Sequence, residues 1–166
     1  MHIRLAEQND LSEILVIYQN ARRFMADTGN PNQWGKVNPP PERTSEDIRE
    51  RNLYVVEENN DILAVFYYKF GDDPTYTVIY GGKWLNDLPY GVIHRIAVSD
   101  KARGRGIAGH CFEFALSKCG NLKIDTHKDN AVMHKVLAKH GFIQCGIIHL
   151  ANGDERIAYQ KVEDKI

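Results

Sequence analysis

Apolar residues recur every three or four positions in several segments of this chain, which is the period of an amphipathic helix. One such stripe covers residues 11–25, and Asp10 opens a capping pattern just before it. A second capping pattern, Thr44 with Asp47, predicts a short helix that ends near Arg51. The residues between these two helices are rich in Gly, Asn and Pro, so we expect a loop there.

Other segments have the alternation or the short apolar runs of β-strands. A short strand is expected at 3–5, and 53–56 and 62–70 should form an antiparallel hairpin through the polar turn 58–61. The segment 75–80 fits either a further strand or an excursion from the sheet, and its pattern does not decide between them.

The segment 90–98 carries apolar residues on both of its faces. We expect a central strand there, because a strand covered on both sides has no solvent-facing row. Strict alternation along this strand would place His94 and Val98 on one face and Arg95 on the other.

The second half of the chain alternates between helical and strand-like segments. The last helix is capped by Asp129 or Asn130 and ends at Gly141, and Asn152-Gly153 predicts the turn of a closing hairpin. The element order therefore predicts one α/β domain, residues 1–166, with a mixed sheet. The segments after the central strand are a helix ending near 119, a strand at 122–126, a helix over 132–137, and strands at 142–150 and 156–162.

Composition narrows the function classes. The 166 residues and 19.0 kDa suit a single domain, and 21 basic against 22 acidic residues leave a charge of -1. This balance argues against nucleic-acid or membrane binding, which usually needs a basic excess. The chain shows no apolar run of membrane-spanning length and no signal-peptide pattern at its start. We therefore expect a cytoplasmic protein.

Cysteine and histidine spacing gives no metal motif. The three cysteines form no CxxC pair, and Cys111 and Cys119 fall in an apolar helical pattern where a small buried thiol is expected. This usage fits a reducing compartment. The seven histidines form no HExxH motif or Cys/His cluster, so no metal site is predicted.

A charged, glycine-containing loop follows the central strand and leads into a helix. Unpaired N–H groups at a helix start attract anions, and glycines let a ligand oxygen approach closely. On the residues alone, two interpretations stay open: a phosphate site, or a tight turn with a solvated basic rim. The loop matches neither the GxxxxGK[ST] nor the dinucleotide GxGxxG pattern. Its glycines are Gly104, Gly106 and Gly109, and its basic residues are Lys101, Arg103 and Arg105.

The run Arg103-Gly104-Arg105-Gly106-Ile107-Ala108, preceded by Ile96-Ala97-Val98, resembles the [Q/R]-x-x-G-x-[G/A] signature of the GNAT superfamily of N-acetyltransferases. A second block, Asn130 through Gly141-Phe142, and the order of elements also resemble that family. The resemblance implies a single-domain α+β fold whose central sheet is mixed and mostly antiparallel, with splayed middle strands and flanking helices.

The resemblance further implies acetyl-coenzyme A as the acetyl donor. The N–H groups from Arg103 to Gly109 would hold the pyrophosphate, and the pantetheine arm would run beside the strand. The N–H of Val98 would polarise the acetyl carbonyl. Asn130 corresponds to an asparagine that contacts the coenzyme arm. The implied coenzyme residues are Ile96, Ala97, Val98, Arg103, Gly104, Arg105, Gly106, Ile107, Ala108, Gly109 and Asn130.

Amine attack on a thioester needs a group that removes a proton from the amine. His94 is the candidate base, because histidine titrates near neutrality and some arylalkylamine acetyltransferases have a histidine at this offset from the same valine. The alternative is a histidine buried beneath the sheet and hydrogen-bonded to backbone. Leu137 stands where a tyrosine acid is common in the family, and His134 and Tyr159 are substitutes that the sequence does not single out.

The family builds its acceptor site from the first two helices and the loop between them. This places Arg22, Phe24 and Trp34 in the substrate pocket, although Trp34 could equally anchor the loop on the core. We therefore expect acetyl transfer to a primary amine in a ternary complex, with a small molecule rather than a protein as acceptor. The alternative is a non-catalytic coenzyme A sensor. The C-terminal hairpin offers an edge for a homodimer.

Overall fold

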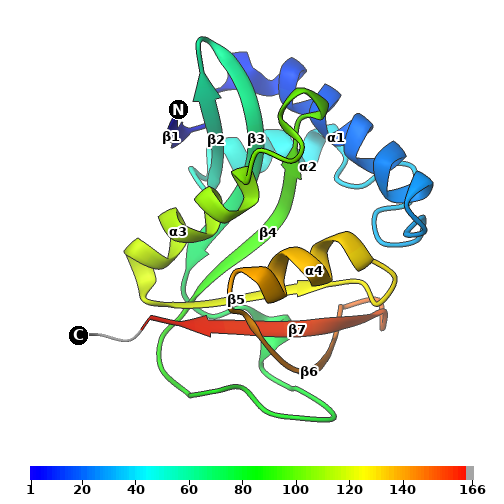
Figure 1. Cartoon of the computed structure of the whole chain (residues 1–166), viewed down its shortest axis with the longest axis vertical. Helices are drawn as coiled ribbons and strands as arrows, with labels where there is room; N and C mark the ends of the chain where they lie inside the picture. Colours follow the sequence, from blue (N-terminus) through cyan, green and yellow to red (C-terminus); the bar gives the residue numbers. More distant parts are fainter. Residues whose placement is uncertain (164–166) are drawn as a thin grey trace.

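The computed structural model describes residues 1–163, and its strands form one seven-stranded sheet in the order β1-β2-β3-β4-β5-β7-β6 (Figure 1). All neighbouring strands are antiparallel except β4 and β5. The mixed, mostly antiparallel sheet predicted from sequence is confirmed. The strands are β1 His2–Leu5, β2 Leu53–Glu58, β3 Asp61–Phe70, β4 Gly91–Val98, β5 Asn121–Thr126, β6 Ile143–His149 and β7 Glu155–Val162; the helices are α1 Leu11–Asp27, α2 Pro41–Arg49, α3 Ile107–Cys119 and α4 Ala131–Lys139.

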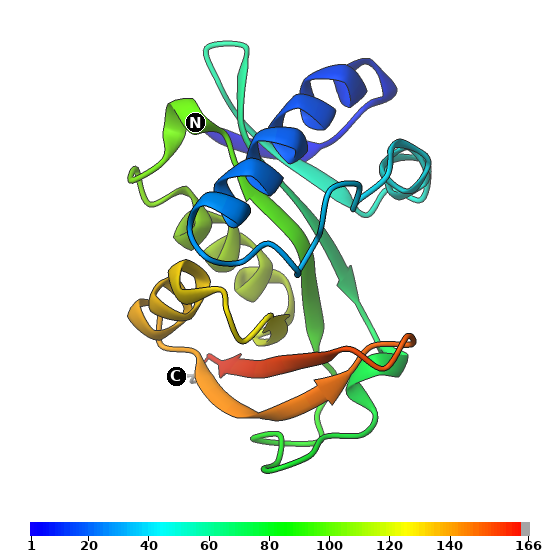
Figure 2. The same ribbon diagram turned by 90° about the vertical axis from the view of Figure 1, so that its right-hand side faces the viewer.

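Strands β4 and β5 separate soon after they meet. Their parallel pairing is limited to Gly91 with Leu122 and Val92 with Lys123. Beyond these pairs the two strands run in different directions, and Figure 2 shows the opening between the two halves of the sheet. The expected splaying of the middle strands is confirmed, and it leaves one edge of β4 without a neighbouring strand.

The sheet has a separate hydrophobic core on each face. Helices α1 and α2 cover one face, where Ile14, Tyr18 and Val65 belong to the first core. Helices α3 and α4 lie on the other face, where Phe66 and Phe112 belong to the second. Since β3 supplies residues to both cores in alternation, it is buried on both sides, as a central strand must be.

A β-bulge at Arg95 interrupts the alternation along β4. Val65 pairs with Ala97 and Tyr67 with His94, so β4 contains one more residue than β3 between these pairs. Arg95 has a φ of +50°, which accommodates the extra residue.

The bulge overturns the prediction that His94 and Val98 share a face. His94 lies opposite Tyr67, on the side of the first core, whereas Val98 lies opposite Ala64, on the side of the second. The prediction assumed that side chains alternate strictly between the two faces of the strand. The extra residue in the bulge shifts this alternation by one position.

Helix α1 starts after Asp10 as predicted but without the expected side-chain cap, and helix α2 starts earlier than predicted. The Asp10 carboxylate accepts hydrogen bonds from Arg4 and from the N–H of Glu7, and it makes no cap to α1. The hydrogen bond from Arg4 lowers the pKa of Asp10. Helix α2 begins at Pro41, three residues before Thr44, because proline suits the first helical position.

Residues 71–90 form an excursion rather than a strand. Pro74–Tyr76 is a single 3-10 turn, and Tyr80 pairs with Ile147 only as an isolated bridge. The Trp84 indole donates to the carbonyl of Tyr76 at 2.9 Å, which fixes the excursion over the first core. The question left open for 75–80 is thereby answered.

The last helix and hairpin agree with the sequence prediction. The Asn130 side chain caps α4, and Gly141, with a φ of +76°, follows the helix end.

All three cysteines are free, and burial raises the pKa of Cys111 to about 12. Among the residues described, no helix combines the length and apolar character needed to cross a bilayer.

Helices α3 and α4 approach closely at Gly109. A Cβ atom there would lie 2.7 Å from Nε2 of His140 and closer still to Cε1. Gly109 therefore provides space for the His140 ring, in addition to lining a cavity.

We predict that Gly109→Ala lowers the free energy of unfolding by about 1–3 kcal/mol, although Gly→Ala usually stabilises a helix, because the methyl group overlaps the ring. Chemical denaturation of Gly109→Ala, His140→Ala and the double variant measures this. The double variant should be more stable than the sum of the single changes predicts. Strict additivity would contradict the proposed overlap.

Candidate active site

Two cavities lie on either side of the gap between β4 and β5. The glycine-loop cavity, about 330 Å³, lies between the end of α1, the loop before α3, and α4. The His94 cavity, about 750 Å³, lies between β4, the start of β7 and the α1–α2 loop. Both are lined by Met25, Ile96, Asn130 and Met133, so they meet at the gap.

The start of α3 presents backbone donors to the glycine-loop cavity. The first-turn N–H groups of Ile107, Ala108 and Gly109 have no partner within the helix, and no side chain caps them. Gly106 precedes the helix with a φ of +74°, and a Cβ there or at Gly104 would meet nothing within 4 Å. The N–H of Arg105 is already donated to Ala102. This turn can therefore accept an anion on backbone N–H groups and the helix dipole.

The two arginines of the loop are paired with carboxylates. Arg103 pairs with Asp100, and its guanidinium lies 3.7 Å from the centre of the Phe24 ring. Arg105 donates to Glu58 at 2.7 Å and does not line the cavity; this hydrogen bond lowers the pKa of Glu58. The anion-binding capacity of the loop thus lies mainly in its backbone.

Strand β4 lines the glycine-loop cavity with Ile96, Ala97 and Val98. The N–H of Ser99 donates to the carbonyl of Leu63 at 2.8 Å, which makes these two residues a hydrogen-bonded pair. Pairs alternate along an antiparallel ladder, so Val98 occupies the next, non-hydrogen-bonded position. Its N–H therefore points away from β3 and into the gap.

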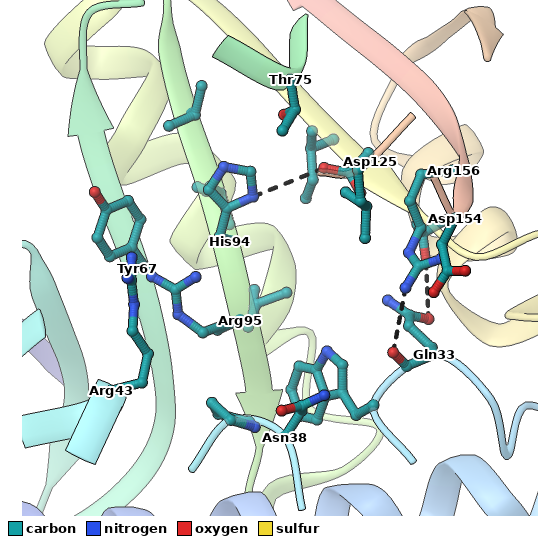
Figure 3. Close-up of a pocket in the computed structure, with 18 of the residues that line it drawn as sticks. Gln33, Asn38, Arg43, Tyr67, Thr75, His94, Arg95, Asp125, Asp154 and Arg156 are labelled. Carbon is teal, nitrogen blue, oxygen red and sulfur yellow. Dashed lines mark hydrogen bonds and ion pairs between the residues drawn. The ribbon is translucent and has the colours of Figure 1, made fainter. Parts of the chain in front are cut away.

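In the other cavity, which Figure 3 shows, His94 lies between two carboxylates. Its Nε2 is 2.7 Å from Asp73 Oδ2, and its Nδ1 is 3.7 Å from Asp125 Oδ1. Asp125 also accepts a hydrogen bond from the Tyr76 hydroxyl at 2.6 Å. A neutral imidazole that donates from Nε2 to Asp73 keeps its lone pair on Nδ1, which can accept a proton.

Asp73 is held as a carboxylate. Burial raises its pKa, but the hydrogen bonds from His94 and Thr75 outweigh this effect and leave the pKa well below its ordinary value. Its Oδ1 atom accepts from both the N–H and the hydroxyl of Thr75. The Asp73 side chain is therefore positioned by the turn at Pro74–Tyr76 and in turn orients His94.

Comparison with known proteins gives the family. Residues 17–142 match the model of the Acetyltransferase (GNAT) family. The chain belongs to the GNAT acetyltransferase family. Enzymes of this family use acetyl-coenzyme A as the acetyl donor.

Individual relatives agree with this assignment. A Streptococcus agalactiae 2603 GNAT acetyltransferase structure is 34% identical, with a TM-score of 0.90 over 99% of this chain and 96% of that one. The Bacillus subtilis (strain 168) protein "Putative phosphinothricin acetyltransferase YwnH" is 26% identical over 89% of this chain and 86% of its own. A Listeria monocytogenes 4b F2365 GNAT acetyltransferase shares the fold at 18% identity, with a TM-score of 0.71, 97% of this chain and 94% of that chain being covered.

The structure separates the three residues expected in the GNAT acceptor pocket. Trp34 lines the His94 cavity and also packs edge-on against Tyr18, with ring centres 5.5 Å apart, so it is both a wall and an anchor. Phe24 lines the glycine-loop cavity instead. Arg22 lines neither cavity, because its guanidinium turns to the loop carbonyl of Asn38 at 3.2 Å. The expectations for Phe24 and Arg22 are corrected accordingly.

The side chain of Asn130 is engaged within the protein. Its Oδ1 accepts from the N–H of Met133 at 3.0 Å, and its Nδ2 donates to Gln33 Oε1 at 2.9 Å. Asn130 therefore ties the α1–α2 loop to α4 at the junction of the cavities. A role in contacting the coenzyme arm stays a prediction.

The candidate acids lie away from the cavities. His134 Nδ1 and the Tyr159 hydroxyl are 2.6 Å apart, and neither residue lines either cavity. Leu137 is fully buried in the second core.

Sequence reasoning missed several residues of the His94 cavity. Asp73, Asp125, Arg95 and Arg156 all line it. Asp125 and Arg156 were detectable as charged residues within otherwise apolar strand patterns, whereas Asp73 lies just before the segment whose structure the pattern did not decide.

We predict that Asp73→Asn destabilises the protein by about 1–3 kcal/mol near neutral pH, because the hydrogen bonds to a charged acceptor are lost. A carboxyl group with a lowered folded-state pKa stabilises the fold above its unfolded pKa, and this contribution is lost on acidification. The stability difference between the natural protein and the variant should therefore narrow as the pH falls from about 5 towards 2. Denaturation curves across this range measure it; a constant difference would contradict the lowered pKa.

Proposed function

We propose that this protein transfers the acetyl group of acetyl-coenzyme A to a primary amine by direct attack in a ternary complex. The observation that carries the proposal is the meeting of two cavities at the gap between β4 and β5. One cavity has the donors for an anionic coenzyme, and the other has a candidate base. An acetyl donor and an amine that enter from opposite sides would meet at the gap.

The residues present fit the coenzyme. The N–H groups of Ile107, Ala108 and Gly109 would hold the pyrophosphate, with Gly104 and Gly106 leaving room for its approach. The free edge of β4 at Ile96–Val98 would hydrogen-bond the pantetheine arm. When bound, acetyl-coenzyme A supplies an activated acyl thioester. The Val98 N–H, which points into the gap, would bind the carbonyl oxygen.

His94 would act as the base. Its Nδ1 would accept the proton of the attacking amine, while Asp73 holds Nε2–H and stabilises the imidazolium that forms. The Asp125 carboxylate, 3.7 Å from Nδ1, would attract the protonated amine as it enters. No side chain is assigned as the acid, so coenzyme A would leave as the thiolate or take its proton from water.

The acceptor in this proposal is a small molecule, for which the His94 cavity of about 750 Å³ has room. The name of the Bacillus relative adds phosphinothricin to the amines worth testing. Free thiol released from acetyl-coenzyme A should be followed with a panel of polyamines, arylalkylamines, amino acid derivatives and phosphinothricin. Amine-dependent release supports the transferase. Coenzyme binding without release by any amine would favour a sensor.

We predict that Gly106→Val abolishes coenzyme A binding, because a branched side chain would be strained at this positive φ and would fill the space before the helix. Coenzyme A at a hundredfold excess over Kd should stabilise the natural protein by about 2.7 kcal/mol and so raise its Tm. In Gly106→Val this thermal shift should disappear. Arg105→Ala is the matched control and should retain most of the shift, since Arg105 faces Glu58. An undiminished shift in Gly106→Val would place the coenzyme elsewhere.

We predict that His94→Ala lowers kcat mainly below pH 8, where the acceptor amine is protonated and needs a base. The thermal shift with coenzyme A should be unchanged, because His94 lies in the other cavity. Rates measured from pH 6 to 9 test this. Turnover equal to that of the natural protein across the range would remove His94 from the mechanism.

A further inference from the structure

The arginines that line the His94 cavity differ in whether a carboxylate pairs with them. Arg95 donates from Nε to Asp47 Oδ2 at 2.9 Å and lies 4.5 Å from the centre of the Tyr67 ring. Arg43 approaches the other oxygen of Asp47 at 3.2 Å. Both arginines therefore have a carboxylate partner, and burial raises the pKa of that carboxyl group despite them.

Arg156 differs from these two arginines. It is only 6% exposed, and its guanidinium donates to two backbone carbonyls, Glu155 at 2.9 Å and Gln33 at 3.2 Å. It makes no ion pair with any carboxylate of residues 1–163. Asp154 lies near it in Figure 3, but that carboxylate is exposed and accepts from Asn152 at 3.1 Å.

A buried guanidinium cannot relieve its desolvation by losing a proton. An uncompensated buried charge is costly, and a neutral carbonyl offsets this cost less than a carboxylate does. Arg156 thus presents to the cavity a positive charge that no carboxylate of the described residues neutralises. An oxyanion on the ligand would satisfy it, with the planar geometry that favours carboxylates.

Carboxylates line the same cavity. The carboxylates of Asp73 and Asp125 flank His94. Arg156 projects into the cavity from the start of β7 (Figure 3). A ligand that satisfies both regions carries an ammonium group at one end and an anion at the other. Lys36 and Lys69 also line the cavity but are exposed to solvent.

We propose that the acceptor is a carboxylate-bearing primary amine of the amino acid type, with its carboxylate on Arg156 and its amine between His94 and Asp125. This inference rests on the proposed function for the chemistry, but the recognition of the carboxylate by Arg156 can be measured without turnover. It disfavours polyamines, arylalkylamines and protein N-termini as acceptors, because these have no carboxylate beside the amine.

The experiment compares the common amino acids that have a primary amine, in the L form where they are chiral, each with its own α-carboxamide. The two members of a pair differ in one negative charge and little in shape. For the preferred amino acid, kcat/KM should exceed that of its amide by about 10- to 100-fold, the range expected for a charge-assisted hydrogen bond. Thermal shifts with the same pairs, in the presence of coenzyme A, measure binding independently of catalysis.

Variants of Arg156 assign this preference to the residue. Arg156→Gln keeps a donor for the Gln33 carbonyl but removes the charge, so the acid should lose most of its advantage while the amide changes by less than about threefold. Arg156→Lys should restore part of the preference. The KM for acetyl-coenzyme A should stay unchanged. Arg22→Gln is the matched control, because Arg22 also donates to a carbonyl of the α1–α2 loop but lies outside both cavities.

The outcomes separate this inference from the proposed function. Amides that react as well as the acids, or an Arg156→Gln variant that weakens both members of a pair equally, would overturn the carboxylate site. Binding of amino acids but not amides, without thiol release by any amine, would support the site and overturn the transferase. If no member of any pair binds or reacts, the carboxylate site is overturned, and thiol release with the other amines of the panel decides the transferase separately.

Discussion

The divergence of β4 and β5 after two residue pairs determines where this protein can bind ligands. Each strand satisfies its other edge, β4 with β3 and β5 with β7. The edges that face each other are left with backbone groups that no neighbouring strand pairs. Unpaired N–H and C=O groups inside a protein cost free energy, so a ligand that enters the gap and pairs with them is favoured. The two cavities meet at this gap.

The bulge at Arg95 distributes the chemistry between the two faces of the sheet. Without the extra residue, His94 and Val98 would lie on one side of β4. With it, His94 faces the cavity that contains Asp73 and Asp125, and the Val98 side chain faces the second core. The Val98 N–H still lies in the plane of the sheet and points into the gap. A base and a backbone donor can therefore approach one reaction centre from different directions.

Local sequence was sufficient wherever a feature depends on neighbouring residues. The glycine-containing block 103–109 predicts a turn and a helix start that leave backbone donors free, and the structure has such a turn. The Asn130 cap, the hairpin at 58–61 and the end of α4 at Gly141 depend on φ preferences or on a side chain three residues away. The start of α2 was predicted too late in the chain. Thr44 and Asp47 form a capping pattern in the sequence, but in the structure the Asp47 carboxylate pairs with Arg43 and Arg95.

The sequence by itself therefore determined the α/β class with a mixed sheet and the glycine loop, because periodicity and turn chemistry act over a few residues. The splayed middle strands and the flanking helices were implied by the resemblance to the GNAT superfamily. Only the tertiary structure decided the composition of the His94 cavity. Asp73, His94, Asp125 and Arg156 come from four separate segments, and a one-residue bulge reverses which face His94 occupies. No local pattern records a contact between segments this far apart, since such contacts depend on register and on how the strands splay.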